Sequence, residues 1–169
     1  MKQTDNFKFD EANVMNELVY RNLSEDAKRQ ICAWKYGGEY DLYNLPAYEE
    51  MQVRQIGFMN PQREKNYYGF WDESILVGFV NILEEKEEVF IGIGVNPDLC
   101  NKHYGQRMLL ITYEISKRLY PDKPLYLEVR TWNIRAVKCY QKAGFRIDGQ
   151  AYELTTGIGT GTFYRMIRE

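Results

Sequence analysis

The 169-residue sequence is poor in several features that would place it in a specialised class of protein. Its three cysteines, Cys32, Cys100 and Cys139, lie far apart and are odd in number, so they cannot all pair within the chain. This indicates free thiols in a reducing cytosol. No stretch approaches the roughly 20 apolar residues of a membrane span, and the polar residues 1–13 lack the apolar core of a signal peptide. We therefore expect a cytoplasmic protein with no membrane partner.

The sequence also has little excess of charge of either sign and a single histidine. It lacks clusters of residues that could bind a metal. The formal net charge is -2, with acids and bases interspersed. This argues against a nucleic-acid partner, because phosphate contacts need a basic field. His103 is the single histidine, so any Ser/His/Asp catalysis would have to depend on it. No group of cysteines and histidines has the spacing of a metal site, and we expect no metal.

What the sequence does contain is a globular composition, with 44% hydrophobic and 27% charged residues. No internal repeat, low-complexity tract or Pro/Gly linker divides the chain, and its length suits one domain with a sizeable core. We therefore expect a single domain over residues 1–169. Aromatic residues make up 15% of the chain, so many of them must be half-buried or line a pocket.

In the first third of the chain, residue patterns predict a strand, two helices and an aromatic loop between them. Residues 17–23 form an apolar-rich run typical of a strand. Ser24 is a suitable N-cap for a helix that ends near Trp34. The loop over residues 36–46 is rich in tyrosine, and a second helix follows from Ala47.

The middle of the chain predicts an antiparallel meander followed by a helix. Residues 66–71, 75–83 and 88–95 are β-rich runs separated by polar turns. Apolar residues then recur at three-to-four spacing, which predicts an amphipathic helix over residues 104–119.

The last third predicts a strand over residues 125–130 and a helix over residues 133–142, with Gly144 at the position of a left-handed C-cap. Residues 145–154 and 162–167 are expected to close as a hairpin around the glycine-rich residues between them. These glycines resemble a phosphate loop, but no helix follows them, which favours a plain hairpin turn. A meander followed by two strand–helix units predicts an α+β domain.

Two segments could carry chemistry. The first is the junction between residues 88–95 and the helix from Tyr104, because a helix N-terminus presents unpaired N–H groups and favours anions. Its loop adds Lys102 and Gly105, although most such junctions bind nothing. The second is the strand over residues 125–130, where alternation separates Leu127 and Val129 from Glu128.

The helix that follows this strand carries a stripe of residues on one face. Asn133, Ala136 or Val137, and Tyr140 share it, since seven residues make about two turns. On position alone, a tyrosine there serves packing more often than catalysis.

The order and spacing of these segments resemble a known family. Val95-Asn96-Pro97-Asp98, the loop to Gly105, and the run Asn133-x-x-Ala136-x-x-x-Tyr140-x-x-x-Gly144-Phe145 are similar to the GCN-five-related N-acetyltransferase (GNAT) superfamily. The match extends over roughly residues 75–145. Within that superfamily, Leu127-Glu128-Val129-Arg130 with Asn133 and Tyr140 is most similar to the ribosomal-protein N-terminal alanine acetyltransferases.

The resemblance implies a fold and a cosubstrate. The fold would be a three-layer α+β structure, with a central mixed twisted sheet of about six or seven strands flanked by about four helices. The sheet would splay into a V between the strand that ends at Val95 and the strand over residues 125–130. Acetyl-CoA would lie in that V.

Position by position, the resemblance implies a binding site for the cofactor. The backbone of Ile93 and Val95 would pair with the pantetheine arm, backbone N–H groups of residues 101–106 would cradle the pyrophosphate, and Asn133 would hold the pantetheine. The complete set of implied cofactor-binding positions is Ile93, Val95, Cys100, Asn101, Lys102, His103, Tyr104, Gly105, Gln106, Asn133, Ala136, Tyr140 and Lys142.

Two of these positions depart from the family pattern. Members usually have Gln or Arg where Cys100 stands and Gly where His103 stands. A side chain at His103 could crowd the pyrophosphate or donate a hydrogen bond to it, so the departure bears on cofactor affinity more than on fold.

The resemblance also implies catalytic roles. Tyr140 would lie beside the sulfur, where a phenol with a pKa of about 10 can protonate the leaving thiolate. A base is needed because an alkylammonium has a pKa of about 10.4. Glu128 matches the catalytic glutamate of the alanine acetyltransferase branch, with a surface carboxylate as the alternative interpretation. Glu88 is a second candidate base.

In this superfamily the segment between the first two helices commonly walls the acceptor site. We therefore expect Trp34, Tyr36, Tyr40 and Tyr43 to contact the acceptor, with Glu39 or Asp41 available to a cationic one. Core packing is an equal alternative for Trp34.

The leading hypothesis is an N-acetyltransferase that moves an acetyl group from acetyl-CoA to a primary amine, of a small molecule rather than a protein N-terminus, by direct attack. Two alternatives are an acyl-CoA sensor without catalysis and a structural domain that has lost the cofactor. An exposed edge strand near the C-terminal hairpin could support a homodimer.

Overall fold

The computed structural model describes residues 18–169, and in this part of the chain eight strands form one sheet. The strands are β1 (Val19–Asn22), β2 (Tyr67–Asp72), β3 (Ile75–Glu84), β4 (Val89–Val95), β5 (Leu125–Arg130), β6 (Arg146–Ile147), β7 (Tyr152–Thr156) and β8 (Gly159–Arg168). Their order in space is β1-β2-β3-β4-β5-β8-β6, and β7 pairs with β8. The sheet is mixed, because β4 and β5 are parallel while the other pairs are antiparallel.

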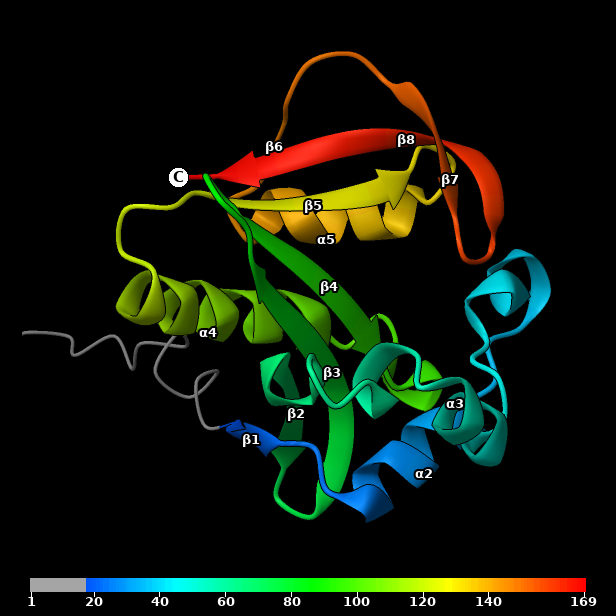
Figure 1. The fold of residues 1–169 in the computed structure, drawn as a ribbon. Helices are drawn as coiled ribbons and strands as arrows, with labels where there is room; N and C mark the ends of the chain where they lie inside the picture. Colours follow the sequence, from blue (N-terminus) through cyan, green and yellow to red (C-terminus); the bar gives the residue numbers. More distant parts are fainter. Residues whose placement is uncertain (1–17) are drawn as a thin grey trace, which may run out of the picture.

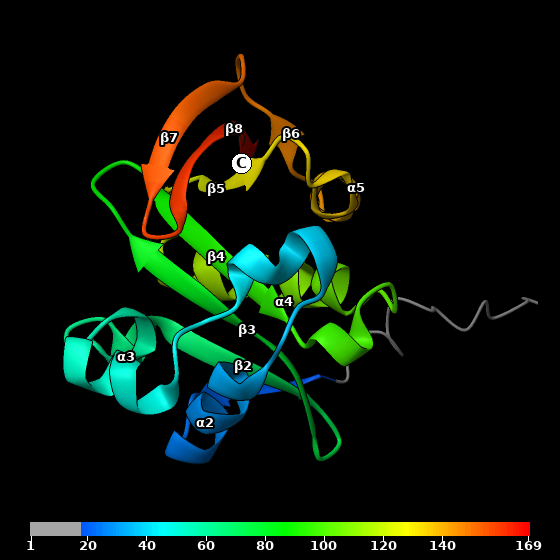
Figure 2. The same ribbon diagram turned by 90° about the vertical axis from the view of Figure 1, so that its right-hand side faces the viewer.

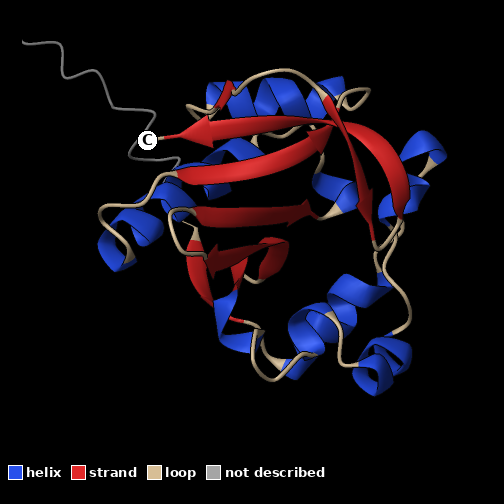
Figure 3. Cartoon of the chain, turned by 45° about the horizontal axis from the view of Figure 1, so that its top comes forward, coloured by secondary structure: helices blue, strands red, loops and turns tan. Residues whose placement is uncertain are grey.

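Helices lie on both sides of this sheet (Figure 3), which makes a three-layer α+β architecture. The α-helices of the described part are α2 (Glu25–Ala33), α3 (Tyr48–Arg54), α4 (Tyr104–Leu119) and α5 (Ile134–Lys142). The 3-10 helices are η1 (Gly38–Tyr43), η2 (Gly57–Met59), η3 (Glu64–Asn66) and η4 (Pro97–Leu99). Over residues 18–169, no helix combines the length and apolar character needed to cross a bilayer.

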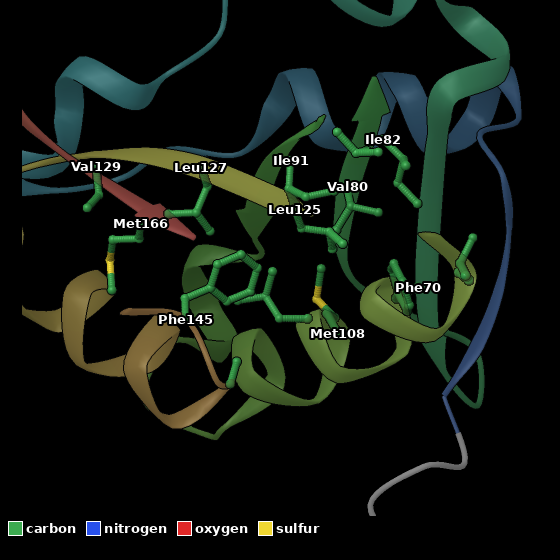
Figure 4. Packing of buried hydrophobic residues seen from close by; sticks show 14 of the residues in the cluster. Phe70, Val80, Ile82, Ile91, Met108, Leu125, Leu127, Val129, Phe145 and Met166 are labelled. Carbon is green, nitrogen blue, oxygen red and sulfur yellow. The ribbon is translucent and has the colours of Figure 1, made fainter. Parts of the chain in front are cut away.

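Alternation along the strands divides the apolar side chains between two cores, one on each face of the sheet. On one face Leu127 and Val129 of β5 pack with Met108 of α4, as Figure 4 shows. On the other face Ile31 of α2 packs in a cluster with Trp71 of β2. β5 is therefore apolar toward α4 and α5, and its opposite face is left for polar side chains.

The sheet opens between β4 and β5, which diverge from a narrow end to a wide end (Figure 1). The two strands pair only at Val89 with Leu125 and at Phe90 with Tyr126. Each strand is held along its length by its other neighbour, β4 by β3 and β5 by β8. The edge of β4 from Ile91 to Val95 therefore faces the opening without a strand partner. This is the V-shaped sheet that the family resemblance implies.

Most of the predicted helices and strands are confirmed. Two helix ends show how the residues there determine where a helix begins or ends. The Ser24 side chain accepts a hydrogen bond from the Ala27 N–H at 3.2 Å and so caps α2. Gly144 follows α5 with a φ of +90°, the left-handed conformation that glycine adopts without strain. The helix over residues 104–119 and the strand over residues 125–130 have their predicted bounds.

The prediction is wrong at the C-terminal hairpin. Residues 145–154 are not one strand but two, β6 and β7, separated by a segment in which Gly149 has a φ of +77°. The turn is also shorter than predicted, because Thr156 pairs directly with Gly159 and leaves only two residues between the strands. β7 pairs with β8 alone among the described strands, and the homodimer stays a prediction. Residues 1–13 and the predicted first strand residue, Glu17, lie outside the described residues.

Candidate active site

A cavity of about 690 Å³ occupies the open end of the V. Its wall combines η1 and its flanks, the open edge of β4, the loop into α4, β5 and α5. The predicted cofactor-binding positions line it except Lys102, and so do the four predicted aromatic acceptor-binding residues, whereas Lys102, Glu39 and Asp41 are exposed and lie outside the wall. The structure thus brings together segments that are far apart in the chain.

The loop between β4 and α4 keeps its shape despite the unusual residues in it. Asn96 caps η4 by accepting from the Asp98 N–H at 3.0 Å, and its own amide donates to the Leu76 carbonyl at 3.1 Å. His103, the N-cap residue of α4, has a φ of +64°, the left-handed region that favours glycine. The backbone therefore has the conformation that favours the usual glycine, and the exposed His103 lies at the wall of the cavity.

Gly105 is needed for packing in the first turn of α4. A Cβ at this position would lie 3.0 Å from the sulfur of Cys139 on α5, closer than carbon and sulfur normally approach. The small residue therefore lets α4 and α5 come together where both line the cavity.

The coenzyme end of the cavity is basic. Arg135, Lys138 and Lys142 of α5 line it together with His103, and the N-terminus of α4 adds unpaired N–H groups and the positive end of its dipole. Glu128 is the one acidic side chain that the described residues contribute to the wall. This combination suits a polyanionic ligand such as a pyrophosphate.

Tyr140 projects from α5 into the same cavity. Among the described residues no group forms a hydrogen bond with its hydroxyl. Burial raises the pKa of Tyr140, and the nearby Cys139 and Tyr43 add to the rise. The side chain is therefore a protonated phenol at neutral pH, with its O–H free to donate to a ligand.

Glu128 lies on the polar face of β5, opposite Leu127 and Val129, as predicted. Its carboxylate lines the cavity and accepts a hydrogen bond from the hydroxyl of Tyr152 on β7. Burial, followed by this hydrogen bond, raises the pKa of Tyr152. Tyr152 was missed by the sequence analysis, because it lies 24 residues from Glu128 and faces it only through the register of β7 on β8.

Glu88, the second candidate base, lies outside the cavity and forms an ion pair with Arg165. Both of its carboxylate oxygens accept hydrogen bonds from the guanidinium of Arg165 on β8, one at 3.1 Å. The Nε of Arg165 also donates to Asp148 at 3.1 Å. Glu88 does not line the cavity, so the geometry favours Glu128.

The aromatic segment around η1 covers the open side of the sheet, and Figure 2 shows it rising from α2 toward α5. Asn44 fastens its two ends, because its side-chain oxygen accepts from the Tyr36 N–H at 2.6 Å. The Tyr36 hydroxyl in turn donates to the carbonyl of Val95 at 2.6 Å. One side chain of the segment is thus attached to the last residue of β4.

The other end of this segment is attached to α5. The Asn133 amide donates to the Tyr43 hydroxyl at 3.3 Å, while its oxygen caps α5 by accepting from the Ala136 N–H at 3.2 Å. The rings of Tyr40 and Tyr43 also pack on Trp132, with centroids 5.6 and 6.2 Å apart respectively. Asn133 therefore organises the wall of the site as well as its helix.

The acids of the aromatic segment do not reach the cavity. Glu39 and Asp41 are exposed and are absent from its wall. The expectation that one of them would face a cationic acceptor finds no support in this arrangement. Trp34 lines the cavity and also packs against Phe79, with ring centroids 6.2 Å apart, so it serves packing, and its contact with the acceptor stays a prediction.

Comparison with known proteins identifies this architecture. The sequence model of the acetyltransferase (GNAT) family matches residues 30–145, more than half of the chain. The chain belongs to the acetyltransferase (GNAT) family. No curated protein sequence matches this GNAT chain.

Solved structures share the fold of this GNAT acetyltransferase. A chimera of the spermidine N-acetyltransferase SpeG from Vibrio cholerae and hSSAT is 19% identical, with a TM-score of 0.70 over 89% of this chain and 93% of that one. A GNAT-family acetyltransferase from Bacillus anthracis is 18% identical, with a TM-score of 0.70 over the same shares of the two chains. One from Streptococcus pneumoniae is 23% identical, with a TM-score of 0.64 over 90% and 98% of the chains.

Membership in the GNAT family makes the protein an acyl-CoA-dependent acetyltransferase, since acetyl-CoA is the cosubstrate of this family.

The described residues contain no cluster of three or more metal-ligating side chains. All three cysteines are free thiols, as predicted.

Proposed function

We propose that the chain is a single-domain enzyme that transfers an acetyl group from acetyl-CoA to the primary amine of a small molecule by direct attack. The observation that carries this proposal is the meeting of four features in one cavity. These are the unpaired edge of β4, the N-terminus of α4, the free hydroxyl of Tyr140 and the carboxylate of Glu128. Each is needed for a different part of the reaction.

The coenzyme would be bound largely by backbone groups. The edge of β4 around Ile93 and Val95 offers peptide groups to the pantetheine arm, as a neighbouring strand would. The Val95 carbonyl already accepts from Tyr36, but a carbonyl oxygen has two lone pairs and can accept a second hydrogen bond. The first turn of α4 and the basic side chains of α5 would hold the phosphates.

Glu128 and Tyr140 would divide the proton transfers between them. Glu128, directly or through a water molecule, takes a proton from the ammonium so that a neutral amine can attack the thioester carbon. As the C–S bond breaks, the Tyr140 phenol donates its proton to the departing thiolate, and the nitrogen, which becomes cationic on attack, gives its surplus proton back to the Tyr140 phenolate. The products are an amide, free CoA and one released proton, and no acyl-enzyme is formed.

The acceptor would be small, because η1 and its aromatic flanks narrow the site above the sheet. Several structural neighbours bear names that mention spermidine. The wall of this cavity gives little support for a polyamine, since Glu128 is its single acidic side chain among the described residues. A molecule with three or four cations would need several carboxylates.

The first test is calorimetric titration of the purified protein with acetyl-CoA and with CoA, followed by thiol-release assays with small amines and with short peptides. One-to-one binding and thiol release with a small amine are the expected results. Binding without release from any acceptor would identify an acyl-CoA sensor. Release with peptides alone would identify a protein N-terminal acetyltransferase, and no binding at millimolar coenzyme would overturn the proposal.

A further inference from the structure

Arg130, the last residue of β5, is a buried cation on the acceptor side of the site. It is 8% exposed, and it lines the cavity two residues after Glu128. The two side chains share one face of β5, opposite the face that packs on α4 and α5. Arg130 is therefore separated from the phosphate-binding end, where α4 begins.

The guanidinium of Arg130 has no carboxylate partner in residues 18–169. Nη1 and Nη2 donate to the carbonyls of Thr160 and Gly159 at 3.4 Å, which is long for such bonds. Nε is buried and has no hydrogen-bond acceptor. The remaining contact is with the Phe163 ring, whose centroid lies 5.0 Å from the guanidinium carbon.

The other buried cation of residues 18–169 is paired with two carboxylates. Lys28, which is 2% exposed, donates to Glu25 at 2.8 Å and to Glu64 at 2.9 Å. Arg165, on the strand beside Arg130 and on the same face, is held by Glu88 and Asp148. Because a buried charge without a counter-ion is costly, the unpaired state of Arg130 calls for an anion that residues 18–169 do not supply.

The neighbouring strand is shaped to hold this guanidinium. A Cβ at Gly161 of β8 would lie 2.0 Å from Nη1 of Arg130, so only glycine leaves room for the group at that point. The guanidinium thus occupies the space that the absence of a side chain at Gly161 leaves, close to Phe163.

We propose that Arg130 binds a carboxylate of the acceptor, so that the acceptor of this enzyme is an amine that also carries a carboxylate. This inference rests on the proposed function and narrows its substrate class. The planar, forked guanidinium matches a carboxylate in two parallel hydrogen bonds. Cα atoms two residues apart on a strand are about 6.6 Å apart, so Glu128 and Arg130 can reach the amine and the carboxylate of one small molecule. The same arrangement repels a polycation.

The test compares amines that differ only in the carboxylate, namely lysine with cadaverine, tyrosine with tyramine and phenylalanine with phenethylamine. Thiol release from acetyl-CoA gives kcat/KM for each member of a pair. We expect the wild-type enzyme to prefer the carboxylated member of its best pair by about tenfold or more. Arg130→Met should bring that ratio close to one.

The matched control is Arg135→Met, which removes another arginine from the same wall. The guanidinium carbon of Arg135 lies 4.1 Å from the centroid of the Tyr40 ring, at the α5 side of the cavity. Its loss should leave the ratio between the paired amines as it is in the wild type. A ratio that fell equally in both variants would indicate a general effect of positive charge and overturn the assignment to Arg130.

A binding measurement separates failure of this inference from failure of the proposed function. If amines release thiol but the plain member of each pair is preferred, the carboxylate inference falls and the acetyltransferase proposal stands. If no amine releases thiol, titration of the N-acetylated amino acids in the presence of CoA decides the matter. Binding that is lost in Arg130→Met supports the inference, and absence of binding overturns it.

Thermal unfolding tests whether Arg130 has a purely structural role. Since the variant removes a buried charge without a counter-ion, Arg130→Met should keep or raise the melting temperature. A melting temperature lower by several degrees, together with equal loss of activity on both members of every pair, would show that Arg130 supports the fold and does not bind a carboxylate.

Discussion

The two ends of the cavity are built in different ways. The coenzyme end consists mainly of backbone at the edge of β4 and the start of α4, which form one continuous stretch of chain, with basic side chains of α5 beside them. The acceptor end consists of side chains from η1, β5 and β8, which are far apart in the sequence, and Tyr152 of β7 contacts Glu128 there. His103 shows the consequence, because a histidine replaces the usual glycine and the turn is kept. A site made of backbone depends on conformation, whereas a site made of side chains depends on the identity of each residue.

The largest effect should come from Tyr140, which contributes chemistry where the two ends meet. Tyr140→Phe removes the acid and should lower kcat by about 10²-fold or more, while the Kd for CoA changes little. Because burial raises the pKa of Tyr140, the wild-type rate should stay high beyond pH 10, where an ordinary tyrosine ionises. Steady-state kinetics from pH 7 to pH 10.5, with calorimetry for CoA, check both points. Unchanged turnover in the variant would remove the acid role.

The two candidate bases give the next comparison. Glu128→Gln should lower kcat by about 10²-fold, because the substituted amide cannot accept the proton of the amine. Glu88→Gln should leave kcat near the wild-type value but reduce the free energy of unfolding by about 1 kcal/mol, because Arg165 keeps only one charged partner. Kinetics and thermal unfolding of both variants distinguish the roles. A large loss of kcat in Glu88→Gln would reverse the assignment.

Asn133 connects the two ends, so its loss should affect binding and stability together. Asn133→Ala removes the cap of α5 and the hydrogen bond to Tyr43. We expect a loss of about 1–2 kcal/mol in stability and about tenfold weaker binding of CoA, measured by thermal unfolding and calorimetry. Asn133→Asp, which keeps the capping oxygen but not the donor to Tyr43, should recover most of the stability. Unaltered CoA affinity in Asn133→Ala would refute its part in coenzyme binding.

The smallest effect is expected at His103, because its backbone already has the left-handed conformation that glycine favours. His103→Gly removes a left-handed strain of roughly 1 kcal/mol, which the greater freedom of glycine in the unfolded chain largely offsets. The Kd for CoA should stay within about twofold of the wild-type value by calorimetry. A tenfold loss would show that the imidazole itself contacts the pyrophosphate and that the coenzyme end depends on side chains after all.

The difference between the coenzyme end and the acceptor end also determined which parts of the site could be predicted from the sequence. The bounds of α4 and β5 follow from local patterns, because the residues involved are neighbours in the chain. The opening of the V was implied by the family resemblance, and the capping role of Asn133 was not predicted. The family match and the fold therefore agree with the sequence prediction.

The acceptor end could be predicted only in outline. The aromatic residues of η1 were expected at the site, but the contact of Tyr152 with Glu128 depends on the register of β7, which residue patterns do not specify. Arg130 looks like an ordinary end of a strand until the fold shows that no acidic side chain of the described residues pairs with it. In the same way, the isolation of Glu88 from the cavity becomes visible only once Arg165 is brought beside it.

The short pairing between β4 and β5 has a mechanical consequence. Two residue pairs, Val89 with Leu125 and Phe90 with Tyr126, form the whole joint between the two halves of the sheet. The tip of β4 at Val95 lies about 17 Å beyond this joint, so a rotation of about 5° there would move the tip by about 1.5 Å, roughly one carbon–carbon bond. The width of the wide end therefore depends strongly on the angle between β4 and β5 at this short joint.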